Sequence, residues 1–168
     1  MPSKLSLSVL MGTLVTTLAT SNVNAADVIR HKIPDSDFPI SLAIEIPADA
    51  QVVNFSGVVP AVINSKADPS SIAAYGDTET QTVSVLKIIE ANLKNLNLSI
   101  GDVVKMQVYL VGVTEHGGKM DFAGFMKGYR QFFGTAAQPL LPTRSTFQVA
   151  ALANPGFLVE IEVTAVRR

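Results

Sequence analysis

The most informative absences in this 168-residue chain are cysteine and tryptophan, of which it has none, and histidine, of which it has two. Without cysteine the fold has no disulfide, and the chain has no thiolate to act as nucleophile or metal ligand. His31 and His116 lie far apart, without the short spacing of a metal-binding pair. The sequence therefore predicts neither a metal centre nor a cofactor.

Charge is also scarce, since only 16% of the residues are charged whereas 48% are hydrophobic. The chain has 13 Lys and Arg residues and 14 Asp and Glu residues, a formal net charge of −1. Because no basic patch stands out in this balance, we expect no nucleic-acid partner. An apolar N-terminal segment and a core shared between subunits would both explain the high hydrophobic content.

The N-terminal segment has the composition of a secretory signal peptide. Lys4 is its only charged residue, Leu5 to Leu18 are apolar or small, and Val23-Asn24-Ala25 places small residues where signal peptidase cuts. We expect residues 1–25 to be the signal and residues 26–168 a single domain, periplasmic or secreted and free of the membrane. An uncleaved anchor is the alternative, but the apolar stretch is short against the about 20 residues of a spanning helix.

Hydrophobic periodicity predicts two helices and several strands. Apolar residues recur at three- and four-residue intervals after Thr78 and after Asp121, which is typical of helices with one buried face. Thr78 and Gln81 form a possible capping box for the first helix, with Asp77 as the rival cap. The expected helices span residues 78–96 and begin again at 121, and the expected strands span residues 28–32, 40–46, 51–56, 103–111, 144–151 and 157–166.

The order of these elements predicts an α+β domain with two helices packed on one face of a mixed sheet. The other face also has to be covered, and we expect another copy of the chain to cover it. The turn residues Asn154-Pro155-Gly156 are expected to join the last two strands. An aromatic stripe on the second helix is expected to be core. It consists of Phe122, Phe125, Tyr129, Phe132 and Phe133.

Arg144 and Glu160 are polar residues on strands that otherwise build a core. A turn centred near Asn154 would place position 148 opposite 160, so an offset of four residues would separate the pair by about 13 Å. We therefore expect no direct salt bridge within one chain. Either Arg144 pairs with a carboxylate of a neighbouring subunit or it binds an anion, because a guanidinium fork suits a carboxylate.

The run LPTRSTFQVAALANPGFLVEIEVTAVRR (141–168) resembles the C-terminal signature of the Rid family, the YjgF-type reactive intermediate deaminases. The signature combines a Pro-x-Arg-Ser start, a Val-Ala-x-Leu middle and a Val-Glu-Ile-Glu end. Further matches lie at Asn54 to Gly57, at Asp77 to Gln81, at Gly101 to Lys105 and at Tyr129 with Phe132-Phe133, so that the resemblance covers about residues 50–168. It implies a chorismate-mutase-like fold and a homotrimer with clefts between adjacent subunits.

The resemblance also implies an activity, the hydrolysis of 2-imino acids, or of enamines that tautomerise to them, to 2-keto acids and ammonia. Arg144 then holds the substrate carboxylate and Glu160 helps to hold the attacking water, while Ser56, Gly57 and Thr146 line the cleft. A protonated imine is already electrophilic, so orientation by Arg144 and a water positioned by Glu160 suffice, without metal, cofactor or covalent nucleophile.

The sequence departs from the family pattern at three places. Ile40 stands where deaminases of the family carry a tyrosine, Val58-Val59-Pro60 replaces Gln-Ile-Pro, and Met126 replaces an asparagine. These changes predict a more apolar pocket and a different substrate. The alternative function is a non-catalytic trimer that binds a small carboxylate.

A ribonuclease or chaperone-like role, described for some relatives, is a third possibility. Removal of residues 1–25 takes Lys4 away and leaves 12 basic against 14 acidic residues, a net charge of −2. This charge disfavours tight RNA binding.

Overall fold

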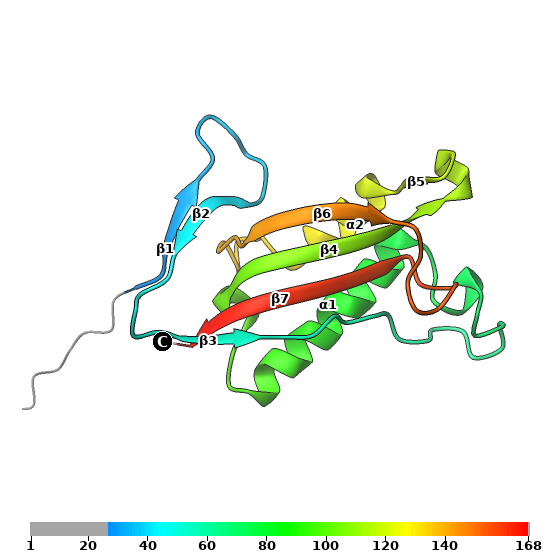
Figure 1. The fold of residues 1–168 in the computed structure, drawn as a ribbon, viewed down its shortest axis with the longest axis horizontal. Coiled ribbons are helices and arrows are strands. Elements are labelled where there is room, and N and C mark those ends of the chain that lie inside the picture. Colours follow the sequence, from blue (N-terminus) through cyan, green and yellow to red (C-terminus); the bar gives the residue numbers. More distant parts are fainter. Residues whose placement is uncertain (1–26, 168) are drawn as a thin grey trace, which may run out of the picture.

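The computed structural model describes residues 27–167, so the expected signal peptide (1–25) lies outside the described residues. A layer of two helices covers one face of the main sheet (Figure 1), as the sequence predicts. No helix of the described part is long and apolar enough to cross a membrane. The elements are β1 (Ile29–Lys32), β2 (Ser41–Glu45), β3 (Gln51–Asn54), α1 (Thr78–Asn95), β4 (Val103–Val113), β5 (Lys119–Met120), α2 (Phe122–Tyr129), β6 (Thr143–Val149) and β7 (Val159–Arg167).

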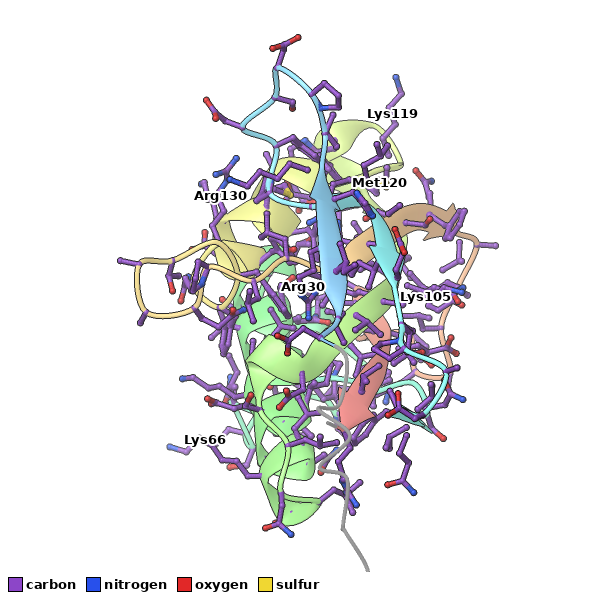
Figure 2. All side chains as sticks on the ribbon, turned by 90° about the vertical axis from the view of Figure 1, so that its left-hand side faces the viewer. Arg30, Lys66, Lys105, Lys119, Met120 and Arg130 are labelled. Atoms are coloured by element: carbon purple, nitrogen blue, oxygen red, sulfur yellow. The ribbon has the colours of Figure 1, made fainter. Side chains whose placement is uncertain are left out.

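The central strand β4 explains why the sheet has two unlike faces. Its alternate residues Val104, Met106, Val108 and Leu110 are at most 3% exposed and belong to the hydrophobic layer beneath the helices. The residues between them lie on the open face, where Lys105 extends away from the helices (Figure 2). Because side chains alternate along a strand, the strands next to β4 also direct their side chains alternately to the helix-covered face and to the open face.

The pairing of β6 and β7 differs from the prediction. The two strands do not form a hairpin, because β4 lies between them, parallel to β6 and antiparallel to β7. A parallel neighbour needs a crossover connection, and α2 supplies it between β4 and β6. Phe147, Tyr109 and Glu160 therefore share one row across three strands, and position 148 does not lie opposite 160.

The first helix begins at its acidic cap. Asp77 accepts a hydrogen bond from the backbone N–H of Thr80 at 2.8 Å, so the rival cap is the one used and the Thr78–Gln81 capping box does not form. Gln81 is instead fully buried. Its amide donates to the carbonyls of Gly76 and Gly156 and accepts from the N–H of Leu158, which fixes the loop before β7.

The segment between β4 and α2 contains the short strand β5, whose two residues are too few to give a signal in the sequence. β5 pairs with the end of β4, where Gly112 lies opposite Met120. A Cβ at Gly112 would lie 2.1 Å from the Gly118 carbonyl oxygen, so only glycine allows this close approach. Gly112 therefore lies where the backbone of the following loop approaches the end of β4 closely.

A separate hairpin of β1 and β2 stands beside the start of β6 (Figure 1). Arg30 anchors it, since its guanidinium donates to the carbonyls of Gly101, Val103 and Leu141 at 2.6–3.0 Å (Figure 2). The N–H of Ser41 also donates to the Pro142 carbonyl at 2.9 Å. These bonds fix the segment 38–40, which leads into β2, next to β6.

Candidate functional site

Arg144 leaves β6 on the face covered by the helices, next to the buried Met106 of β4. Its Nη1 is buried and has no hydrogen-bond partner, and no ion pair within residues 27–167 includes it. Burial lowers the pKa of Arg144, and the neighbouring Tyr129 opposes this shift. A guanidinium nevertheless keeps its proton in a protein, so this face holds a positive charge with no acidic partner.

Four aromatic rings surround the guanidinium. Its Cζ lies 4.3 Å from the ring centroid of Tyr129 and 5.0 Å from that of Phe125. The rings of Phe38 and Phe122 follow at 5.4 and 5.9 Å. Ring faces attract a cation but carry no net charge and accept no strong hydrogen bond, so Arg144 keeps its donors for an anion.

Thr146 is a second unsatisfied group on the same strand face. Its Oγ1 is buried without a hydrogen-bond partner, like Nη1 of Arg144. The two residues are separated by one position, about 7 Å along a strand. Buried polar atoms without partners are rare and costly, so together they indicate a ligand site. We call Arg144 and Thr146 the anchor half-site.

A hollow of about 270 Å³ lies beside Arg144 at the start of β6. Ile33, Ile40 and Leu42 of the hairpin region form its apolar side. The hydroxyl of Ser41, which also lines it, donates to the Leu141 carbonyl at 2.6 Å and is not free for a ligand. The hollow thus brings Ile40 next to Arg144, and Lys105, Thr143 and Ser145 also line it.

Glu160 lies on the open face of the sheet, in the row of Tyr109. A Cβ at Gly57 would lie 2.0 Å from its Oε1, so the carboxylate rests directly on the glycine. Within residues 27–167 no hydrogen bond or ion pair involves the Glu160 carboxylate. Glu160 and Gly57, with the exposed Ser56 beside them, form what we call the glutamate half-site.

The second glutamate of β7 is engaged elsewhere. Glu162 accepts a hydrogen bond from the hydroxyl of Tyr109 at 3.3 Å, and Gln107 donates to that hydroxyl at 3.1 Å. Burial, and after it the charge of Glu162, raises the pKa of Tyr109. The phenol therefore remains a donor at neutral pH. Among the described residues, Glu162 is therefore hydrogen-bonded, whereas the Glu160 carboxylate is not.

The two half-sites do not meet within one chain. Arg144 projects from the helix-covered face and Glu160 from the open face. In addition, two strand spacings and three residues separate them, about 10 Å in each direction. The expectation that they make no salt bridge in one chain is confirmed, although the reason is the intervening β4 and not a hairpin offset. Within one chain, the Glu160 carboxylate therefore cannot reach the Arg144 guanidinium.

The sequence did not reveal the aromatic surroundings of Arg144. The stripe on α2 is core as expected, since Phe125, Tyr129 and Phe133 are at most 1% exposed. Its rings also enclose a guanidinium from β6, and Phe38 joins them from the hairpin region. These contacts depend on the crossover geometry, so no local spacing signals them. Within residues 27–167, no group of three His, Cys, Asp or Glu residues is placed to hold a metal.

Proteins with similar sequences include a reactive intermediate deaminase and a RutC family protein. The chain is 37% identical over 91 residues to a reactive intermediate deaminase of Escherichia coli, TdcF. That alignment covers 54% of this chain and 64% of TdcF, so the chain matches less than two thirds of that relative. A RutC family protein of Pyrococcus abyssi is 29% identical over 139 residues, which are 82% of this chain and 94% of that protein.

Solved structures show the same fold. The crystal structure of E. coli TdcF with bound serine has a TM-score of 0.54 at 28% identity and covers 84% of this chain and 98% of its own. The Rid protein YyfB of Yersinia pestis has a TM-score of 0.59 at 24% identity, which shows the fold alone. It covers 81% of this chain and 96% of its own.

The family model described as Endoribonuclease L-PSP matches residues 39–167, which include both half-sites. This match takes in the whole sheet of β3 to β7 and both helices. The chain therefore belongs to the endoribonuclease L-PSP family, which is the YjgF or Rid family.

Proposed function

We propose that this protein hydrolyses 2-imino acids, or the enamines that tautomerise to them, to 2-oxo acids. In the reaction the protonated imine carbon gains a water oxygen and its C–N bond breaks, so that one imine and one water yield one 2-oxo acid and one ammonium ion. The observation that carries the proposal is the pair of buried, unpartnered polar atoms, Arg144 Nη1 and Thr146 Oγ1. A carboxylate supplies the charge and the acceptor oxygens that such a pair lacks.

The active site of this proposal lies between two copies of the chain in a homotrimer. Arg144 and Glu160 face opposite sides of one sheet, so each site takes the anchor half-site of one copy and the glutamate half-site of its neighbour. Closed rings of identical subunits use such unlike surfaces at every interface. The open face also offers the Phe147 side chain, 48% exposed, for burial against a neighbour.

The chemistry follows from the charges of the two half-sites. Arg144 holds the substrate carboxylate and fixes the distance between the imine carbon and the water, which supplies proximity. Glu160 accepts a hydrogen bond from that water and takes its proton as the C–O bond forms. Glu160 then returns this proton to the amino group, the C–N bond breaks as ammonia leaves, and the carbinolamine hydroxyl loses its proton through Glu160 to that ammonia, which gives the 2-oxo acid and ammonium. Gly57 keeps the carboxylate surface clear, because any larger residue meets Glu160.

The test traps the substrate before it hydrolyses. An amino-acid oxidase generates 2-imino acids in place, semicarbazide captures them, and an active protein lowers the yield of semicarbazone by consuming the imine first. We expect the wild type to compete and Arg144→Ala to lose this competition. Arg144→Lys keeps the charge without the planar fork and should retain only part of the rate. A folded wild type that never competes, across small and large side chains, contradicts the proposal.

A second candidate function is the binding of a small carboxylate without turnover. The observation that favours it is that one chain already holds both residues of the anchor half-site, whereas Glu160 of the same chain lies on the opposite face of the sheet and cannot reach a ligand bound there. Ile40 and Met126, which replace a tyrosine and an asparagine, point the same way. Calorimetric binding of a 2-oxo acid together with no imine hydrolysis would select this alternative.

The family description also contains a ribonuclease activity. The net charge of −2 after removal of residues 1–25 makes this role unfavourable, because RNA affinity rests largely on cationic contacts to phosphate.

We further propose that the protein is exported, on the evidence of the apolar segment and the small residues before Ala26. Mass spectrometry of the N-terminus and cell fractionation test this proposal.

A further inference from the structure

Tyr129 joins the anchor half-site to the wall of the hollow beside it. Its ring is the closest of the four to the Arg144 guanidinium, at 4.3 Å. Its hydroxyl donates to the Pro39 carbonyl at 2.8 Å. One fully buried side chain therefore contacts the carboxylate anchor with its face and the segment 38–40 with its tip.

The hydroxyl is a dependable donor in this place. Burial raises the pKa of Tyr129 to about 12, against the opposing effect of Arg144, so the phenol keeps its proton over the whole physiological range. Further along the segment, the N–H of Ile40 donates to the Phe38 carbonyl at 2.8 Å, which makes residues 38–40 a tight turn. A bond to the central residue of this turn thus positions both flanking side chains.

Those two side chains set the surroundings of a bound ligand. The Phe38 ring lies 5.4 Å from the Arg144 guanidinium, and it is 38% exposed, so it faces the approach to the anchor. Ile40 lines the hollow together with Arg144. Neither side chain offers a hydrogen bond, so a polar substituent placed there would lose its water without replacement, whereas an apolar substituent gains by burial.

Other polar groups of the hollow do not change this character. The hydroxyl of Ser41 is bonded to the Leu141 carbonyl, and that of Thr143 donates to the Val104 carbonyl at 3.2 Å. Lys105 and Ser145 also line the hollow, but they alternate with Met106 and Arg144 along their strands and therefore line it from the side of the open face, opposite to the Arg144 side chain. A ligand bound at Arg144 therefore meets apolar side chains next to its carboxylate.

We propose that Tyr129 is a positioning residue, which holds segment 38–40 against Arg144 and thereby makes the site select 2-imino and 2-oxo acids with apolar side chains larger than methyl. This inference rests on the proposed function, since it assumes a carboxylate on Arg144. To the proposed function it adds the class of substrate side chain and the residue, Tyr129, that determines this preference. Tyr129→Phe should keep the ring beside Arg144 and release the segment.

The test uses the stable products as probes, pyruvate with a methyl group and 4-methyl-2-oxopentanoate with an isobutyl group, by isothermal titration calorimetry on the full assembly. We expect the wild type to bind the isobutyl acid about tenfold more tightly, the scale of discrimination that added methylenes give in an apolar pocket. In Tyr129→Phe this ratio should fall below about twofold, with the Kd of pyruvate nearly unchanged. A general structural defect would weaken both ligands alike.

Tyr75→Phe is the matched control. Tyr75 is also buried, and its hydroxyl also donates to a proline carbonyl, that of Pro69 at 2.9 Å, but it does not line the hollow. Its loss should leave the ratio of the two Kd values intact. A second pair of variants, Ile40→Thr and Ile40→Val, tests the wall without touching the tyrosine, and only Ile40→Thr should lower the ratio.

Three results overturn the inference in distinguishable ways. If the wild type binds both acids equally, or if the ratio of the two Kd values survives in Tyr129→Phe, the positioning role of Tyr129 is wrong while carboxylate binding stands. If the wild type binds neither acid, the proposed function itself fails and the inference fails with it.

Discussion

The two faces of the main sheet differ in the charged residues that they carry and in how these residues are surrounded. On the helix-covered face Arg144 stands among buried apolar side chains and four aromatic rings, and none of the described residues forms an ion pair with it. On the open face Glu162 is bonded to Tyr109, and Glu160 rests on Gly57. A buried cation without a partner lowers stability, whereas a half-exposed carboxylate remains hydrated. The difference is why we propose that Arg144 binds an anionic ligand, whereas Glu160 needs no such partner.

The largest effect should come from removing the cation. Arg144→Met keeps a long apolar chain among the rings, and we expect kcat/KM for imine hydrolysis to fall about 1,000-fold because two charge-assisted hydrogen bonds are lost. The free energy of unfolding should rise by about 1 kcal/mol, since a buried charge is replaced by an apolar group. Imine trapping and urea unfolding measure the two quantities. Lower stability with retained activity would mean that Arg144 is structural.

The glutamate half-site should behave in the opposite sense. Glu160→Gln leaves a neutral group on the open face, so we expect kcat to fall about 100-fold while KM stays similar. The free energy of unfolding should change by less than about 0.5 kcal/mol. Glu162→Gln is the control on the same strand face, and its kcat should stay close to that of the wild type. Equal losses in the two variants would contradict the distinction between the glutamates.

A smaller effect is expected where Glu160 meets the backbone. In Gly57→Ala the new Cβ would lie 2.0 Å from Oε1 of Glu160, so the carboxylate has to move and kcat should fall about tenfold. Gly101→Ala is the control, because the nearest atom to its Cβ lies 3.5 Å away, an ordinary contact. Steady-state kinetics of both variants decides whether the contact between Glu160 and Gly57 affects kcat.

The smallest predicted effect concerns pH and the anchor half-site. The pKa of Tyr129 is raised from 10 to about 12 by burial. A raised pKa means that the stability from the neutral phenol is complete below pH 10 and is lost as the pH rises toward 12. At pH 11 the loss amounts to about 1 kcal/mol relative to pH 8.

Tyr129→Phe has no such group and should not show this part of the loss. Urea unfolding of both proteins at pH 8 and pH 11 gives the comparison. An identical pH dependence in the two proteins would show that Tyr129 is solvated and does not lie buried beside Arg144.

The sequence predicts the strands that contain Arg144 and Glu160 better than it predicts how these strands are arranged in the sheet. The helix predicted for residues 78–96 spans Thr78–Asn95, and the strands around Arg144 and Glu160 lie close to their expected positions. Periodicity and turn residues report local structure, so these elements can be predicted from short windows. They do not tell whether two strands joined by Asn154-Pro155-Gly156 pair with each other or flank a third strand, because that choice depends on the α2 crossover.

The same limit explains which site residues could be predicted. Arg144 and Glu160 were found because charged residues on core strands are unusual, and because their motifs resemble those of a family. The sequence predicts Tyr129 as a core residue that matches the family pattern, but it does not predict that Tyr129 and Phe38 contact the Arg144 guanidinium. Side-chain contacts across the crossover decide their role, and no sequence spacing encodes them.

The central claim, a site composed of two copies of the chain, can be tested by mixing two inactive variants. Arg144→Ala and Glu160→Gln are unfolded together, refolded as an equimolar mixture and assayed by imine trapping beside each variant refolded alone. In a trimer with sites between subunits, about one quarter of the sites should contain an intact arginine and an intact glutamate. Recovery of about that share of wild-type activity is the predicted result. Activity no higher than the mean of the two variants alone, in trimers shown to be mixed, would contradict the account.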